Sequence, residues 1–159
     1  MIPADQLAQW TLAFCAVPSE TGDEDRLCGE TQRWIEAFGV RTRRVGNSLV
    51  AWTEPVAGRQ TVGLIGHLDT VKCASDQPLE LRDGRVYGCG ASDMKAGLAV
   101  QLGLLAEHPA LGAYNMVSVF YDKEEGPATE NGLEPLLLSG AVPALDFAFC
   151  LEPTDNRIQ

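Results

Sequence analysis

Three short runs of β-prone residues, each followed at once by acidic or imidazole side chains, constrain the fold of this chain most strongly. The runs are Thr61–Ile65, Asn115–Tyr121 and Leu145–Leu151. They are rich in branched and aromatic residues, which favour buried strands. Stretches with apolar residues at helical spacing precede or separate them. Strands that alternate with helices predict an α/β fold, in which helices flank a mixed sheet.

Apolar spacing and turn residues locate the remaining elements. Thr21 and Glu24 have the spacing of a capping box at a helix start, and Gly66 and Pro109 are interpreted as the ends of a strand and of a helix. The other predicted elements are helices over Ala4–Cys15, Leu27–Phe38, Ala96–Glu107 and Glu130–Leu138, a strand over Ser48–Thr53 and a hairpin over Leu79–Tyr87.

Composition excludes several classes of partner. The net charge is −10, from 12 basic and 22 acidic residues, which argues against nucleic acid and against an anionic membrane surface. A hydrophobic content of 45% and a charged content of 21% are typical of a soluble globular protein. The apolar runs are too short for a membrane span, and the first residues lack the pattern of a signal peptide. We therefore expect a cytoplasmic protein with no membrane partner.

The cysteines fit reduced thiols better than a disulfide framework, because they are odd in number, widely spaced and without a C-x-x-C pair. They lie at Cys15, Cys28, Cys73, Cys89 and Cys150. Cys73 and Cys89 flank the acidic motifs, so they are either soft metal ligands or small buried thiols. The second interpretation is preferred.

His67 and Asp69 stand two residues apart just beyond the first β-prone run. If the strand geometry persists that far, both side chains leave the same face of the sheet. Imidazole is the commonest side-chain metal ligand, and a ligating histidine usually hands its other N–H to a carboxylate. His67 is thus a candidate ligand, and Asp69 is the carboxylate that would orient it. The alternative is a surface His–Asp pair at an ordinary strand end.

Further acidic residues follow the other runs. Glu124 and Glu125 come after the second run, Glu152 comes after the third, and Asp93 lies between a glycine-rich turn and a helix start. Each alone could be a solvated loop acid, a turn residue or an N-cap. In α/β sheets, however, ligands collect beyond the carboxyl ends of the strands. We therefore predict a metal site at this edge, and its donors match zinc or a similar divalent ion.

The segments GHLDTV, GCGASDMKAG, FYDKEEG and LEPT, in this order, resemble the M20 family of co-catalytic zinc metallopeptidases and deacylases. The resemblance implies a zinc-exopeptidase-like catalytic domain with two zinc ions per complete site, or cobalt in their place. It implies that His67, Asp93, Glu125 and Glu152 are the metal ligands, with Asp93 bridging. Glu124 would then be the general base and Asp69 would orient His67. The resemblance also implies a cis peptide bond after Asp93.

The reaction implied is hydrolysis of an amide in a small N-acyl amino acid. Removal of succinate from N-succinyl-diaminopimelate fits best, and acetylornithine deacetylase, aminoacylase and carboxypeptidase activities are alternatives. Family members are longer and carry a lid and dimerisation domain, then a C-terminal catalytic portion with one more histidine ligand. Residues 1–159 are therefore expected to be the N-terminal portion of the catalytic domain.

His108 is the second histidine of the chain, and we expect it to serve the end of a helix rather than a metal. The chain as given is accordingly expected to be inactive, and a non-catalytic metal-binding module is the alternative function. For the longer form we expect a homodimer.

Overall fold

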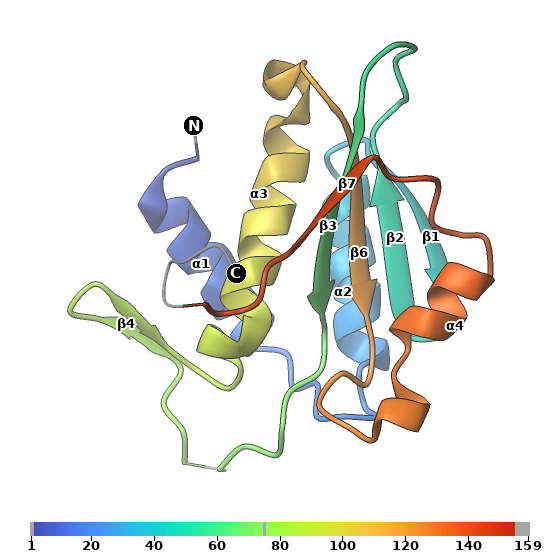
Figure 1. Cartoon of the computed structure of the whole chain (residues 1–159). Coiled ribbons are helices and arrows are strands. Elements are labelled where there is room, and N and C mark those ends of the chain that lie inside the picture. The colour runs from blue at the N-terminus through green and yellow to red at the C-terminus, as the bar shows by residue number, and fades with distance from the viewer. Residues whose placement is uncertain (1, 75, 155–159) are drawn as a thin grey trace.

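The computed structural model describes residues 2–74 and 76–154. A five-stranded sheet with the order β1-β2-β6-β3-β7 forms its centre (Figure 1). The strands are β1 (Arg41–Val45), β2 (Ser48–Trp52), β3 (Thr61–His67), β6 (Asn115–Tyr121) and β7 (Phe147–Cys150). β3 pairs in parallel with both β6 and β7, whereas β2 pairs antiparallel with β1 and β6. The predicted mixed α/β sheet is confirmed.

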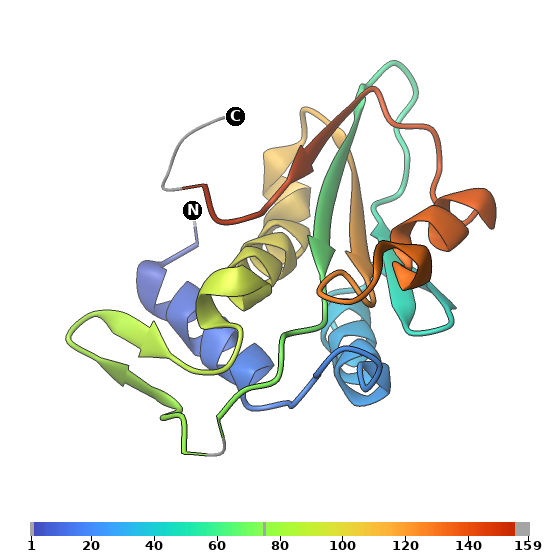
Figure 2. The same ribbon diagram turned by 60° about the horizontal axis from the view of Figure 1, so that its bottom comes forward.

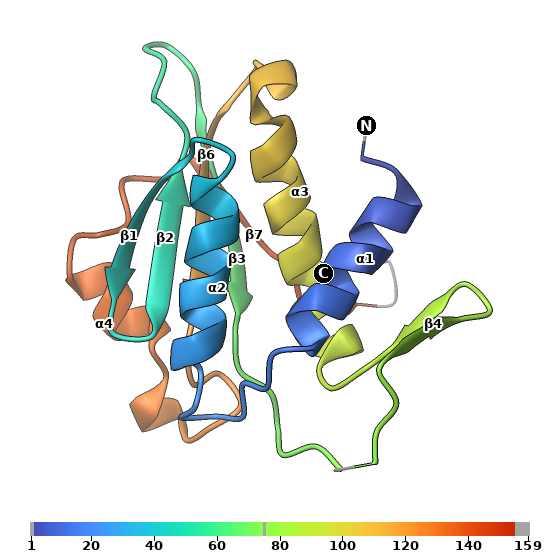
Figure 3. The same cartoon turned by 180° about the vertical axis from the view of Figure 1, so that it is seen from behind.

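Helices cover both faces of the sheet. Three helices lie on one face, as Figure 3 shows from behind, and a short helix lies on the other. The helices are α1 (Ala4–Cys15), α2 (Asp25–Glu36), α3 (Ala96–Leu111) and α4 (Leu133–Leu138). A separate hairpin of β4 (Glu80–Arg82) and β5 (Arg85–Tyr87) matches the predicted one. No helix in the described part of the chain is long and apolar enough to cross a membrane.

Alternation along the central strands builds two apolar cores. On β2, Leu49 packs into the core beneath α1, α2 and α3, whereas Val50 packs into the core beneath α4. On β6, Phe120 joins the first core, and Val119 and Tyr121 join the second. β6 is buried along its whole length, and its sequence NMVSVFY is mostly apolar, as expected for a strand with both faces covered.

Gly66 does not end β3, which continues through it to His67. A Cβ atom at Gly66 would lie 2.5 Å from Met94 Cε and 2.7 Å from Gln101 Nε2. The glycine therefore serves the close approach of α3 to the strand and not a turn. This packing brings the start of α3 against the end of β3.

α3 also runs past Pro109 to Leu111, where the sequence predicted an earlier end. A proline lacks the N–H that would reach the carbonyl of Leu105 four residues back. His108 replaces this donor, because its Nδ1 lies 2.6 Å from the Leu105 oxygen and donates to it. The imidazole of His108 thus serves the helix end, as expected.

Three other elements differ from what the sequence predicted. β7 was expected to be buried, but it is an edge strand with β3 as its neighbour, and Phe147 and Phe149 are 58% and 46% exposed. β1 was not predicted, because its sequence RTRRV is mostly polar. It forms the opposite edge of the sheet and pairs only with β2. The helix predicted over Glu130–Leu138 is divided into a 3-10 turn, Ala128–Glu130, and α4.

Candidate metal centre

The candidate centre lies at the carboxyl ends of the parallel strands, the end that Figure 2 turns toward the reader. His67 is the last residue of β3 and pairs in register with Tyr121 at the end of β6, so the loop with Glu124 and Glu125 begins beside it. Glu152 follows β7, whose Cys150 pairs with Ile65 of β3. Parallel neighbours therefore deliver these side chains to one edge.

Acidic side chains surround the buried imidazole of His67. Its Nε2 lies 3.1 Å from Asp93 Oδ1, 3.8 Å from Glu152 Oε1 and 3.9 Å from Glu124 Oε2. Within two groups the donor atoms lie within 4.8 Å of one another: His67 with Glu124 and Glu125, and His67 with Asp93 and Glu152. The structure thus brings together every residue that the sequence predicted as a ligand or as the base. Their roles stay predictions.

Asp93 reaches the centre from a distorted π-helical turn, Ala91–Lys95, ahead of α3. Its backbone leaves the helical region, with φ −124° and ψ 103°, and the peptide bond to Met94 is cis, as expected. The sulfur of Met94 accepts a hydrogen bond from the backbone N–H of His67 at 3.1 Å. Gly90 stands in the left-handed region with φ 71°, where a Cβ would overlap Thr70. The turn is therefore packed tightly against the end of β3.

Asp69 is fully buried and links His67 to the loop of the two glutamates. Its Oδ1 accepts the backbone N–H of Glu124 at 2.9 Å, and its Oδ2 accepts that of Glu125 at 3.0 Å. The hydroxyl of Thr21 donates to Oδ2 at 2.9 Å. His67 Nδ1 lies 3.4 Å from Oδ1 and 3.0 Å from the Asp69 carbonyl oxygen, which is its nearer partner. With Nδ1 held there, Nε2 is directed at the carboxylates.

Sequence reasoning gave Thr21 the wrong role. It has capping-box spacing, but no side chain caps α2, which begins after Glu24. Glu24 instead accepts the backbone N–H of Gly22 at 2.6 Å. A capping-box pattern fixes only spacing, so it could not reveal that the Thr21 hydroxyl bonds a carboxylate 48 residues away.

The pKa values of the centre reflect crowded negative charge. Burial lowers the pKa of His67, but hydrogen bonding to Asp69 and the charges of Glu152 and Asp69 outweigh it and raise the pKa to about 9. The pKa values of Glu152 and Glu125 are raised, first by burial and then by neighbouring carboxylates such as Asp93. The pKa of Asp69 is lowered, because hydrogen bonds from His67, two backbone N–H groups and Thr21 outweigh its burial. Such a cluster favours a bound cation.

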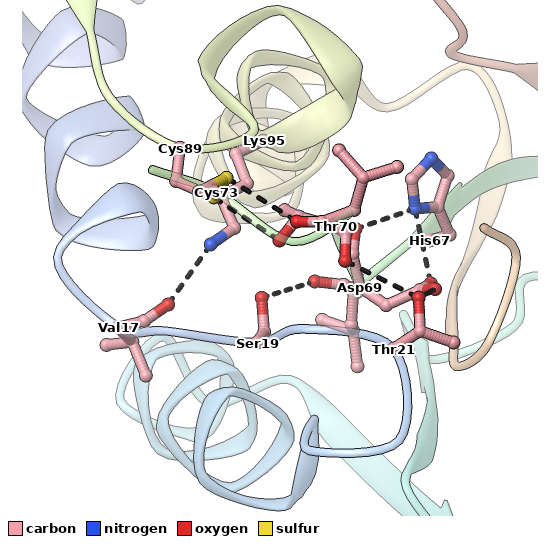
Figure 4. The surroundings of a disulfide bond; sticks show 11 residues. Val17, Ser19, Thr21, His67, Asp69, Thr70, Cys73, Cys89 and Lys95 are labelled. Atoms are coloured by element: carbon pink, nitrogen blue, oxygen red, sulfur yellow. Dashed lines mark hydrogen bonds and ion pairs between the residues drawn. A yellow bond between two sulfur atoms is a disulfide. The ribbon is translucent and has the colours of Figure 1, made fainter. Parts of the chain in front are cut away.

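A disulfide joins Cys73 to Cys89, contrary to the expectation of reduced thiols (Figure 4). Their Cα atoms are 5.9 Å apart, because the hairpin of β4 and β5 returns the chain across 16 residues of separation. The bond ties the loop after Asp69 to the turn that carries Asp93. Neither cysteine is therefore a metal ligand. Their separation in the sequence gave no signal of the pairing.

Lys95 was also missed by the sequence analysis. Its side chain is fully buried, and Nζ donates to the carbonyl oxygen of Val17 at 3.1 Å (Figure 4). Burial lowers the pKa of Lys95 to about 8, although the charge of Cys15 opposes this. The aliphatic part of Lys95 packs near Gly90, where a Cβ would lie 3.2 Å from Cδ. Lys95 thus helps to fix the turn of Asp93.

An open cavity of about 520 Å³ adjoins the centre. Asp93 and Glu125 line one part of it, and Lys72 and Cys73 line another. The cavity is large enough for a small molecule, and it connects solvent to the carboxylate cluster on this side.

Comparison with known proteins identifies the family. The sequence pattern of Peptidase family M20/M25/M40 matches residues 63–159, which is more than half of the chain. The chain belongs to this family. A succinyl-diaminopimelate desuccinylase of Corynebacterium glutamicum is 37% identical over 156 residues, covering 90% of this chain and 40% of that protein. The succinyl-diaminopimelate desuccinylase of Acidiphilium cryptum is 35% identical over 148 residues, covering 86% of this chain and 39% of that protein. The resemblance stated from the motifs is confirmed.

Solved structures of M20 proteins and of related peptidases share the fold. A tripeptidase from Staphylococcus aureus superposes with a TM-score of 0.74 at 21% identity, covering 96% of this chain and 44% of that one. A dinuclear metal-binding peptidase of the M20 family from Bacillus subtilis gives 0.69 at 17% identity, with 92% and 42% covered. The chain thus spans less than half the length of these relatives. That residues 1–159 form the N-terminal portion of a catalytic domain stays a prediction.

Proposed function

We propose that this chain carries part of a zinc-dependent amide hydrolase centre that removes succinate from N-succinyl-diaminopimelate, a step of lysine and cell-wall precursor synthesis. The observation that carries the proposal is the buried imidazole of His67, whose Nε2 faces the carboxylates of Asp93, Glu124 and Glu152. Two relatives named succinyl-diaminopimelate desuccinylase, at 37% and 35% identity, support the choice of acyl group.

The donor set fits a divalent ion such as zinc or cobalt, because one imidazole stands among several carboxylates. His67, Asp93 and Glu152 would hold one ion, and Asp93 with Glu125 would contribute to a second. A bound ion would polarise the amide carbonyl and make water more acidic.

Glu124 is proposed as the general base. Its carboxylate is 38% exposed, and its backbone is anchored by the N–H bond to Asp69, so the side chain reaches both the centre and solvent. Glu124 takes a proton from the attacking water and returns it to the departing amine nitrogen. Asp69 holds His67 in the tautomer that leaves Nε2 free.

A metal-binding module without catalytic activity is the second candidate for the 159-residue chain. One ion would have three protein ligands in His67, Asp93 and Glu152, which is a normal catalytic set. A second ion would have only Asp93 and Glu125 among the described residues, because the imidazole of His108 is engaged at a helix end. We therefore propose that this chain holds one ion more tightly than two and turns over little substrate.

The remaining parts of the proposal concern the whole protein. We propose that its substrate is a small N-acyl amino acid and that the family-length form is a homodimer. We further propose that it acts in the cytoplasm and has neither nucleic acid nor membrane as a partner. The net charge of −10 supports the last point.

A deacylation assay tests this function. N-succinyl-diaminopimelate, N-acetylornithine and a dipeptide are offered to the 159-residue chain and to a family-length protein that carries this sequence. In the longer protein, Glu124→Gln should lower kcat by roughly 10²–10⁴-fold and leave metal content intact, because an amide keeps the shape but takes no proton. Glu134→Gln, on α4, is the matched control and should behave as the parent. Turnover of the acetyl or peptide substrate in preference to the succinyl one would move the assignment to another branch of the family.

A further inference from the structure

We propose that residues 19–21, called the strap below, hold the metal centre in place, and that the hydroxyl of Thr21 is its positioning group. The inference rests on the proposed function, because it concerns the same centre. It adds residues from a segment far from every motif of the family pattern, which matches residues 63–159.

The strap pairs with the segment that continues β3 beyond His67. Glu20 forms a parallel β-bridge with Thr70. The backbone N–H of Thr21 donates to the Thr70 oxygen at 3.1 Å, and the N–H of Thr70 donates to the Ser19 oxygen at 2.9 Å. The buried hydroxyl of Ser19 donates to the Leu68 oxygen at 2.8 Å (Figure 4). The strap therefore fixes the backbone on both sides of Asp69.

The side chain of Thr21 contacts two loops of the centre. Its hydroxyl donates to Asp69 Oδ2 (Figure 4). The same oxygen also accepts the backbone N–H of Glu125. Its methyl group faces Gly126, where a Cβ would lie 2.9 Å from Thr21 Cγ2. Gly126 thus leaves room for the threonine beside the loop of the glutamates. Thr21 thus contacts both Asp69, which is bonded to His67, and the loop that carries Glu125.

The hydroxyl matters because Asp69 is fully buried. A buried carboxylate that loses a donor either moves toward another donor or stays unsatisfied, and both are costly. A movement of Asp69 is transmitted to His67 and to the backbone of Glu125, since both are bonded to it. The distance between predicted ligands from different strands would then change.

The experiment compares two variants of the 159-residue chain. Thr21→Val keeps the shape and removes the hydroxyl, whereas Thr21→Ser keeps the hydroxyl and removes the methyl group. Cobalt affinity is measured by the visible absorption of bound Co²⁺, and zinc affinity by competition. We expect Thr21→Val to lose roughly tenfold in affinity, the lower end of what loss of a ligand's hydrogen-bond partner costs, with an altered cobalt spectrum. Thr21→Ser should restore the parental affinity and spectrum.

Thr42→Val is the matched control, because the hydroxyl of Thr42 bonds Glu36 and Gln32 at the surface away from the centre. It should bind cobalt as the parent does. Circular dichroism verifies folding, and if Thr21→Val does not fold, Ser19→Ala tests the strap through its other hydroxyl and should lose several-fold in affinity.

Parental metal affinity in Thr21→Val, or in Ser19→Ala where that variant is used, overturns the proposed role of the strap. It does not affect the proposed metal centre. A loss in Thr21→Ser as large as in Thr21→Val overturns the role of the hydroxyl. A parent chain that takes up neither cobalt nor zinc overturns the proposed function, and the inference falls with it.

Discussion

Gly66 is predicted to be a residue at which one added methyl group destabilises the protein. In Gly66→Ala, the new Cβ would lie 2.5 Å from Met94 Cε, 2.7 Å from Gln101 Nε2 and 3.0 Å from Leu98 Cδ2. Ordinary carbon contacts are about 3.5–4.0 Å. Met94, Gln101 and Leu98 are all fully buried, so none of them can turn into solvent. The start of α3 must therefore shift away from β3.

The expected cost follows from this overlap. Overpacking a buried site costs about 1–3 kcal/mol. Alanine also restricts the unfolded chain, which offsets about 0.4–1 kcal/mol. We expect Gly66→Ala to lower the free energy of unfolding by roughly 1–2 kcal/mol, close to the difference between the middle values of these two ranges.

Gly29→Ala provides the comparison with the opposite sign. Gly29 lies inside α2, where a Cβ would meet only Arg44 Nη1 at 3.7 Å, an ordinary contact. Alanine is favoured over glycine in a helix by about 0.5–1 kcal/mol, so this variant should be more stable than the parent. Urea unfolding at fixed temperature, followed by circular dichroism, measures both. A Gly66→Ala variant as stable as the parent, or shifts of the same sign in both, would refute the close packing of α3 on β3.

Three further predictions concern the centre and its disulfide. Zinc affinity should rise about tenfold per pH unit between pH 6 and 8, because a ligating imidazole must be neutral and the pKa of His67 is raised to about 9. Calorimetry in buffers of different ionisation enthalpy should find that about one proton is released when zinc binds. A zinc affinity that does not change with pH contradicts this prediction. Calorimetry should also find one tight zinc site per 159-residue chain, and two tight sites would show that the ligand count is wrong. Cys89→Ser removes the disulfide, which joins residues 16 apart in the sequence, and should lower the free energy of unfolding in urea by about 3 kcal/mol. Cys150→Ser, which removes a free cysteine, is the control. An unchanged urea midpoint in Cys89→Ser would mean that the disulfide is absent in solution.

Much of the sheet could be predicted from the sequence, because local pattern and final environment agree there. The bounds of β6, Asn115–Tyr121, were predicted correctly because the segment is rich in β-branched and aromatic residues, which favour a buried strand. β7 has a similar composition, yet its exposure depends on which neighbours cover it, and no local pattern contains that information. The role of Gly66 was predicted wrongly for a related reason. A glycine that lets a helix pack closely on a strand and a glycine that ends a strand look alike in the sequence.

The residues of the centre could be predicted because each follows a strand or begins a helix, and parallel strands bring their ends together. The groups around them could not. Thr21 and Asp69 meet across 48 residues, and Cys73 meets Cys89 through a hairpin whose direction the sequence does not specify. Lys95 is charged, yet the tight turn of Asp93 carries it into the interior. Each of these contacts depends on the assembled fold.

The bonds that Asp69 makes to the loop after β6 have a consequence for how this scaffold could change. Asp69 holds the backbone N–H groups of Glu124 and Glu125 and leaves their side chains free. Substitutions at either position therefore alter the chemistry displayed at the centre without removing the bonds that place the loop. A descendant or a designed variant could replace Glu124 or Glu125 with a neutral or basic residue and keep the same backbone geometry. The backbone of the loop thus stays in place while the side chains that it presents to the centre can change.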